Sequence, residues 1–126
     1  MKMTANTRLV SGVTIVDLRG RIMLGDGSAG LRDLVRNLVS EGIKKILLNF
    51  RNVDYIDSSG LGELVNAFTS VRSEGGELKL LNLTKRVRSL LQITRLLTIF
   101  DITDDEATSV KSFSPDIWPS LLPVPR

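Results

Sequence analysis

Apolar side chains recur along this chain with two different periods, and each period predicts one kind of element. From Leu31 the apolar positions follow the spacing i, i+3, i+4, i+7, i+8, which is typical of a helix that packs on one side and predicts a helix over 29–40. Similar stripes predict a helix over 61–71 and another over 87–91, started by Thr84. A last helix is predicted over 104–113, because Thr103 and Glu106 have the spacing of a capping box.

The N-terminal segments predict a β-hairpin. Residues 9–10 and 13–18 read as strands, and Ser11-Gly12 between them is typical of a tight turn. Alternation in the second strand places its side chains on two faces. Val13 and Ile15 share one face, and Val16 and Leu18 share the other.

The remaining strands are separated by helices. Residues 21–24 predict a short extended piece before a turn at 25–28. Continuous apolar runs at 43–50 and 78–83 predict strands covered on both faces, and 99–102 predicts a last short strand. Strands joined through helices pair in parallel, whereas the hairpin is antiparallel. The expected fold class is α/β: a single domain with a small mixed β-sheet flanked by about four α-helices.

The prolines divide the chain into a body and a tail. All four lie near the C-terminus, at Pro115, Pro119, Pro123 and Pro125. We therefore expect one domain over 1–113 and a Pro-rich tail over 114–126. The tail also holds apolar residues such as Trp118, which is unlike a solvated linker. Packing on the body, extended binding to a partner and loose ordering all remain open for it.

Composition excludes much of enzyme chemistry. The 126 residues include no cysteine and no histidine, which removes disulfides, thiolate nucleophiles, serine–histidine triads and the usual zinc ligands. A net charge of +3 with 5% aromatic residues does not predict direct nucleic-acid binding. The polar N-terminus predicts no signal peptide, and apolar runs of at most three residues predict no membrane span. We expect a cytoplasmic protein without membrane contact.

The most informative segment lies between the predicted strand at 43–50 and the helix at 61–71. It contains Asp57, Ser58, Ser59, Gly60 and Gly62. Any of the first three could cap the helix, and the two glycines leave its first turn open to a phosphate or a partner. A plain helix cap and a functional site are therefore both consistent with these residue types.

The run Asp57-Ser58-Ser59-Gly60-Leu61-Gly62 after an apolar strand resembles the signature of the anti-sigma factor antagonists, which are bacterial STAS-domain proteins. The resemblance extends over about residues 8–113. It also includes Gly20, the segment 47–50, the run Gly75-Gly76-Glu77-Leu78, and the apolar residues from Val87 to Phe100.

The resemblance implies a function as a phosphorylation-regulated switch and not as an enzyme. In the family, the hydroxyl directly after the motif aspartate is phosphorylated, which is Ser58 here. The partner is an ATP-binding serine kinase that doubles as the anti-sigma factor. The unphosphorylated antagonist binds it and frees the sigma factor for transcription, phosphorylation breaks the complex, and a serine phosphatase restores it. No cofactor or metal is implied, and the oligomeric state is left open between a monomer and a weak dimer.

The resemblance also assigns a partner-binding surface. It comprises Asp57, Ser58, Ser59, Gly60, Gly62, Arg21 and Met23. Ser59 is interpreted as structural, with a role as a second phosphate acceptor as the alternative. The two glycines are interpreted as residues that leave space for close approach and do not contact the partner themselves. Arg21 and the apolar Met23 and Leu24 depart from the acidic pattern common in the family, which predicts a different kinase partner. Two rival hypotheses are a STAS scaffold or sensor subunit without a sigma factor output and a small nucleotide-binding hydrolase.

Overall fold

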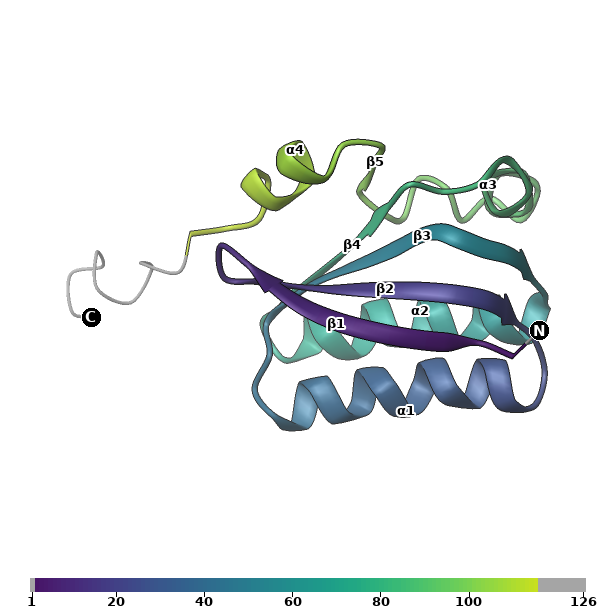
Figure 1. Ribbon diagram of the computed structural model, residues 1–126, viewed down its shortest axis with the longest axis horizontal. Helices are drawn as coiled ribbons and strands as arrows, with labels where there is room; N and C mark the ends of the chain where they lie inside the picture. The colour runs from purple at the N-terminus through teal and green to yellow at the C-terminus, as the bar shows by residue number, and fades with distance from the viewer. Residues whose placement is uncertain (1, 116–126) are drawn as a thin grey trace.

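A computed structural model of the chain describes residues 2–115 and confirms the α/β class (Figure 1). The elements in chain order are β1 (Thr4–Val10), β2 (Val13–Ile22), α1 (Asp26–Ser40), β3 (Lys45–Ile56), α2 (Ser58–Ser73), β4 (Glu77–Leu81), α3 (Lys85–Ile93), β5 (Ile102–Thr103) and α4 (Glu106–Lys111). The strands form one sheet in the order β1-β2-β3-β4-β5. β1 pairs with β2 antiparallel, and every other pair is parallel, as the hairpin and the crossovers predict.

The helices lie on both faces of this sheet. α1 and α2 lie side by side along one face, whereas α3 and α4 lie on the opposite side (Figure 1). The larger core cluster includes Val16 and Leu18 of β2, Leu31 of α1 and Leu64 of α2. A smaller cluster contains Val13 and Ile15 with Leu47, Leu81 and Phe113. The two faces predicted for the second strand are therefore confirmed.

Both central strands are longer than the sequence pattern predicts. The segments at 13–18 and 21–22 form one strand, because Gly20 adopts a φ of 100° and carries the chain through a register shift against β3. A side chain there would collide with the carbonyl oxygen of Lys2, which lies 2.3 Å from the position of a Cβ. β3 continues past residue 50 to Ile56 because its polar C-terminal half still pairs with β2.

The predicted start of the first helix is wrong by three residues. Residues 26–28 form its first turn and not a loop, since Gly25 makes the turn itself with a φ of 100°. Gly27 and Ser28 are buried at the start of α1. A Cβ on Gly27 would lie 2.6 Å from the carbonyl oxygen of Arg21, so this helix end packs directly on the end of β2.

The last strand and the last helix also differ from the prediction. β5 comprises only Ile102 and Thr103. Phe100 instead packs edge to face on Phe68 of α2, with the two ring centroids 5.2 Å apart. Asp105, and not Thr103, caps α4 by accepting a 2.9 Å hydrogen bond from the backbone N–H of Thr108. Thr103 does not cap the start of the helix because it is paired with Leu81 in the sheet.

The described residues include the start of the predicted tail only. Phe113 is buried, whereas Ser114 and Pro115 are exposed. The predictions for residues 116–126 lie outside the described residues. Within residues 2–115, each helix is too short or too polar to cross a bilayer.

Candidate functional site

The site is built where β2 and β3 end next to each other. These parallel strands place Ile22 beside Ile56, so the residues that follow each strand meet at one edge of the sheet. The backbone N–H of Asp57 donates a 3.2 Å hydrogen bond to the carbonyl oxygen of Ile22. The loop that leads to α1 and the first turn of α2 are therefore held together, at the sheet edge where α/β proteins commonly bind ligands.

Asp57 is the N-cap of α2, which decides among the three capping candidates. Its Oδ1 accepts a 2.9 Å hydrogen bond from the backbone N–H of Gly60, and its Oδ2 accepts a 3.0 Å hydrogen bond from that of Leu24. These bonds, that of Gly60 first, hold the pKa of the Asp57 carboxyl below its ordinary value. The charged carboxylate thus ties the β2–α1 loop to the start of α2.

Ser58 is the first residue of α2, and its side chain is exposed. Within the described part of the chain, its hydroxyl makes no hydrogen bond, whereas both neighbours are engaged. The positive end of the helix dipole and the free N–H groups of the first turn favour an anion at this position. The hydroxyl is accessible to another protein, and among residues 2–115 no side-chain base is hydrogen-bonded to it.

Ser59 points to the interior of the α1–α2 contact. Its hydroxyl donates a 3.0 Å hydrogen bond to Oγ of Ser28, which is buried. A phosphate on Ser59 would break this bond and press against the first turn of α1. The contact supports the structural interpretation of Ser59.

The two glycines of the motif have different structural roles. Gly60 is buried, and a Cβ there would lie 2.3 Å from the carbonyl oxygen of Ile22 and 2.6 Å from Cγ1 of Ile56. Gly62 is exposed, and a Cβ there would meet nothing within 4 Å. Gly60 is therefore required for close packing of α2 on the sheet, whereas Gly62 only keeps the surface beside Ser58 flat.

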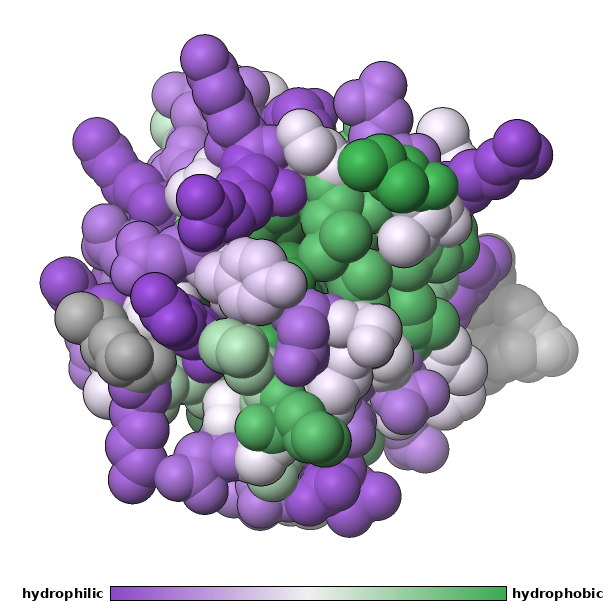
Figure 2. All heavy atoms as spheres, turned by 90° about the vertical axis from the view of Figure 1, so that its right-hand side faces the viewer, coloured by the Kyte–Doolittle hydropathy of each residue, from purple (hydrophilic) through white to green (hydrophobic). Residues whose placement is uncertain are grey.

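Exposed apolar side chains lie at the same end of the molecule. Arg21 and Met23 are exposed, and Leu24 is 82% exposed although its backbone is fixed by Asp57. Ile93 at the end of α3 is 78% exposed. Figure 2 views this end from outside and shows apolar patches among polar side chains. The sequence marks Leu24 as an apolar departure from the family pattern but did not place it on the predicted partner-binding surface. Ile93 was not predicted as a site residue.

The site residues offer no metal-binding or catalytic arrangement. Among residues 2–115, no group of three or more acidic side chains converges in a way that could hold a metal ion. The Asp57 carboxylate accepts from two backbone N–H groups, which lower its pKa and make it a weak base. Chemically, this surface can accept a phosphate and dock a protein.

Comparison with known proteins agrees with this geometry. The STAS domain model matches residues 4–109. The anti-sigma-B factor antagonist of Bacillus subtilis is 40% identical over 73 residues, which cover 58% of this chain and 66% of that protein, just under two thirds of its length. The anti-sigma F factor antagonist of Paenibacillus polymyxa is 30% identical over 104 residues, covering 79% of this chain and 85% of that protein. These relatives are binding regulators and not enzymes, in agreement with the prediction.

Solved structures show the same fold. The crystal structure of an anti-sigma factor antagonist from Thermotoga maritima has a TM-score of 0.80 and 25% identity, covering 86% of this chain and 93% of that one. The phosphorylated form of the Bacillus cell fate determinant SpoIIAA has a TM-score of 0.66 and 19% identity, covering 86% and 97%. The chain belongs to the STAS domain family and, within it, to the anti-sigma factor antagonists.

Proposed function

We propose that this protein is a phosphorylation-regulated partner switch whose control point is Ser58. Unphosphorylated, it binds an anti-sigma factor serine kinase and releases the sigma factor in the cytoplasm. The kinase then phosphorylates Ser58 and the complex dissociates, until a serine phosphatase removes the phosphate. The observation that carries this proposal is the exposed hydroxyl of Ser58, unpaired among the described residues, at the start of α2.

The phosphoryl transfer needs no catalytic group of this chain. The Ser58 Oγ attacks the γ-phosphorus of ATP held by the kinase, the bond to the β-phosphate oxygen breaks, and ADP leaves. The hydroxyl proton passes to a base of the kinase. This chain supplies the acceptor oxygen, which the Asp57 cap holds at a fixed helix end.

Phosphorylation would change the surface while leaving the fold intact. A phosphate brings about −1.5 to −2 charges and three acceptor oxygens. The start of α2 tolerates this charge because the helix dipole favours anions there. The neighbouring Asp57 carboxylate and the added bulk would nevertheless repel a partner that fits the flat, unmodified surface. The SpoIIAA structure in its phosphorylated form supports the proposal, since it shows that this fold can carry a phosphate.

The residues around Ser58 indicate what the partner surface must offer. Leu24 presents an apolar side chain on a loop whose backbone is fixed, which is the arrangement of an interface anchor. Arg21 adds an exposed positive charge on the adjacent strand. A fitting kinase would therefore carry an apolar pocket for Leu24 with an acidic side chain beside it. We assign partner selectivity to Arg21, Met23 and Leu24.

Phosphate mapping tests the proposal. The purified chain is incubated with ATP and the serine kinase that co-purifies with it from its own cells, and intact mass is followed by peptide mapping. We expect one phosphate on Ser58, its loss in Ser58→Ala, and its retention in the matched variant Ser59→Ala. Phosphate on Ser59 would move the control point. Co-purification with a multi-subunit assembly, and no phosphate on either serine, would favour a scaffold or sensor role.

A further inference from the structure

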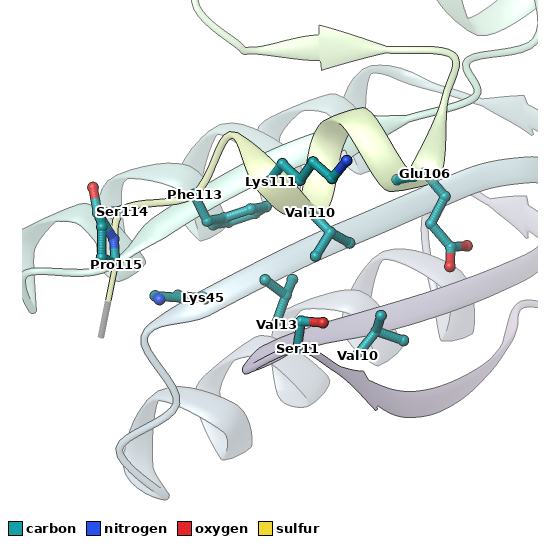
Figure 3. A pocket seen from close by; sticks show the side chains of 11 residues that line it. Val10, Ser11, Val13, Lys45, Glu106, Val110, Lys111, Phe113, Ser114 and Pro115 are labelled. Carbon is teal, nitrogen blue, oxygen red and sulfur yellow. The ribbon is translucent and has the colours of Figure 1, made fainter. Parts of the chain in front are cut away.

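A groove lies at the end of the molecule opposite to Ser58. It is formed between the β1–β2 hairpin and α4 and has a volume of about 510 Å³. Its lining includes Val10, Val13, Val110, Phe113 and Pro115. Figure 3 shows Val110 reaching from α4 toward Val13 and Val10 across the opening. β3 begins beside the groove with Lys45 and ends before Asp57, so about 35 Å of strand separates the two sites.

The floor of the groove is the smaller core cluster. Val13 and Phe113 are 1% and 6% exposed, whereas Val10 and Val110 are only half-buried although they pack on that cluster. The cluster is therefore closed on its sheet side and open along the groove. An aromatic side chain placed there would bury apolar surface of its own, typically about 150–250 Å².

The chain leaves this groove only three residues before a tryptophan, Trp118. Ser114 and Pro115 line the groove, and the backbone N–H of Ser114 donates a 2.8 Å hydrogen bond to Glu77, which fixes the exit direction. Trp118 follows Pro115 by three residues, so its Cα must lie within about 10 Å of the Cα of Pro115 even in a fully extended chain. Such a short tether gives a high effective concentration at the groove.

The composition of the following segment matches the groove. Residues 116–126 hold two charged residues, Asp116 and Arg126, among large apolar ones. The apolar residues are Ile117, Trp118, Leu121, Leu122 and Val124. Asp116 is the next residue after Pro115, and the groove lining carries Lys45 and Lys111. Glu106 also lines the groove, but its carboxylate is paired with Arg8. The charge of Asp116 is opposite to that of the two lysines of the lining.

We propose that this groove is the docking site for the chain's own segment 116–118, with the Trp118 indole inserted between Val10 and Val110. Asp116 then faces Lys111 at the rim, and the indole covers the open side of the smaller core cluster. Docking in this way covers the half-buried side chains of Val10 and Val110 and leaves the Ser58 surface uncovered. The inference is independent of the proposed switch.

Fluorescence of the full chain tests it directly, because Trp118 is the only tryptophan. We expect an emission maximum to the blue of that of a synthetic peptide of residues 116–126, together with several-fold weaker quenching by acrylamide. Neither value should depend on protein concentration. Emission and quenching equal to those of the free peptide would overturn the proposal. Blue emission that appears only at high concentration would also overturn it, in favour of docking in a second copy.

Charge substitutions locate the indole. Val110→Glu should shift the emission to the red and raise quenching toward the peptide value, with folding verified by circular dichroism. Ala107→Glu is a second variant whose site is exposed, so its fold is not at risk, and it should give a smaller shift of the same sign. Leu9→Glu, beside Val10 but 73% exposed and outside the groove lining, is the matched control. Blue emission that neither groove variant changes would place the indole elsewhere and contradict the proposal.

Discussion

Asp57 and Leu24, 33 residues apart in sequence, are joined by a 3.0 Å hydrogen bond from the Leu24 backbone N–H to the Asp57 carboxylate. The same carboxylate caps α2 through Gly60. One side chain therefore fixes both the helix end that presents Ser58 and the loop that presents Leu24. The two halves of the proposed partner surface cannot move independently while this carboxylate is charged.

Removal of the cap should destabilise the fold. Asp57→Ala is expected to lower the free energy of unfolding by about 1–2 kcal/mol, because it loses a helix cap and the bond to Leu24. Asp57→Asn keeps an acceptor oxygen and should lose less. Urea unfolding monitored by circular dichroism measures both. Asp54→Ala, on exposed β3 surface, is the control, and an equal loss in that variant would contradict the role given to Asp57.

The two motif glycines should respond oppositely to alanine. Gly60→Ala places a Cβ against the carbonyl oxygen of Ile22 and should cost about 1–3 kcal/mol of stability through overpacking. Gly62→Ala enters open space inside a helix and should gain about 0.5–1 kcal/mol. Melting temperatures of the two variants provide the comparison. Equal effects would mean that α2 does not pack on β2 as described.

The stability of the fold should decrease in acid, partly because the ion pairs of Arg8 with Asp17 and Glu106 are lost. Arg8 donates hydrogen bonds to Asp17 at 2.7 Å and to Glu106 at 2.7 Å, and it lowers the pKa of both carboxyls. A carboxyl with a lowered pKa in the folded state stabilises the fold above its unfolded pKa. This contribution is lost as the pH falls below about 4 through the folded pKa.

Arg8→Ala should therefore flatten this acid dependence. The side chains of the network are about one third exposed, so solvent screening limits its contribution to about 1 kcal/mol. Urea midpoints at neutral pH and near pH 3 should differ less in Arg8→Ala than in the unmodified chain. An unchanged difference would show that other carboxylates, such as Asp57, dominate the acid response.

Leu24 should act as an anchor for the kinase without supporting the fold. Leu24→Ala is expected to weaken binding by about 2 kcal/mol, or roughly 30-fold, at unchanged melting temperature. Leu9→Ala is a matched control, since Leu9 is 73% exposed but lies in the hairpin strand β1, away from the loop before α1. Similar losses of affinity in both variants would show that this effect is not specific to the Ser58 surface.

The sequence predicted the elements of this fold better than the contacts between them. The alternation in β2 and the stripe in α1 predicted which faces are buried, because burial imposes those periods directly. The bond between Asp57 and Leu24 depends on the pairing of Ile22 with Ile56, which no local pattern contains. Local signals alone therefore left three capping candidates for α2 open.

The errors near the C-terminus have the same origin. Phe100 is apolar because it packs on Phe68 of α2, and an apolar residue of this kind looks like part of a strand in the sequence. Thr103 and Asp105 are both able to cap a helix, and only the pairing of Thr103 with Leu81 decides between them. Tertiary contacts overrode the local preference at both positions.

The central claim is that phosphate on Ser58 dissociates the complex with the kinase. Calorimetric titration of the kinase with the phosphorylated and the unphosphorylated chain tests this claim most directly. The account predicts that the fully phosphorylated chain keeps its fold but binds more than 100-fold more weakly, which corresponds to about 3 kcal/mol. Ser58→Ala should bind as well as the unmodified chain. Equal affinity of the phosphorylated and unphosphorylated forms would contradict the account.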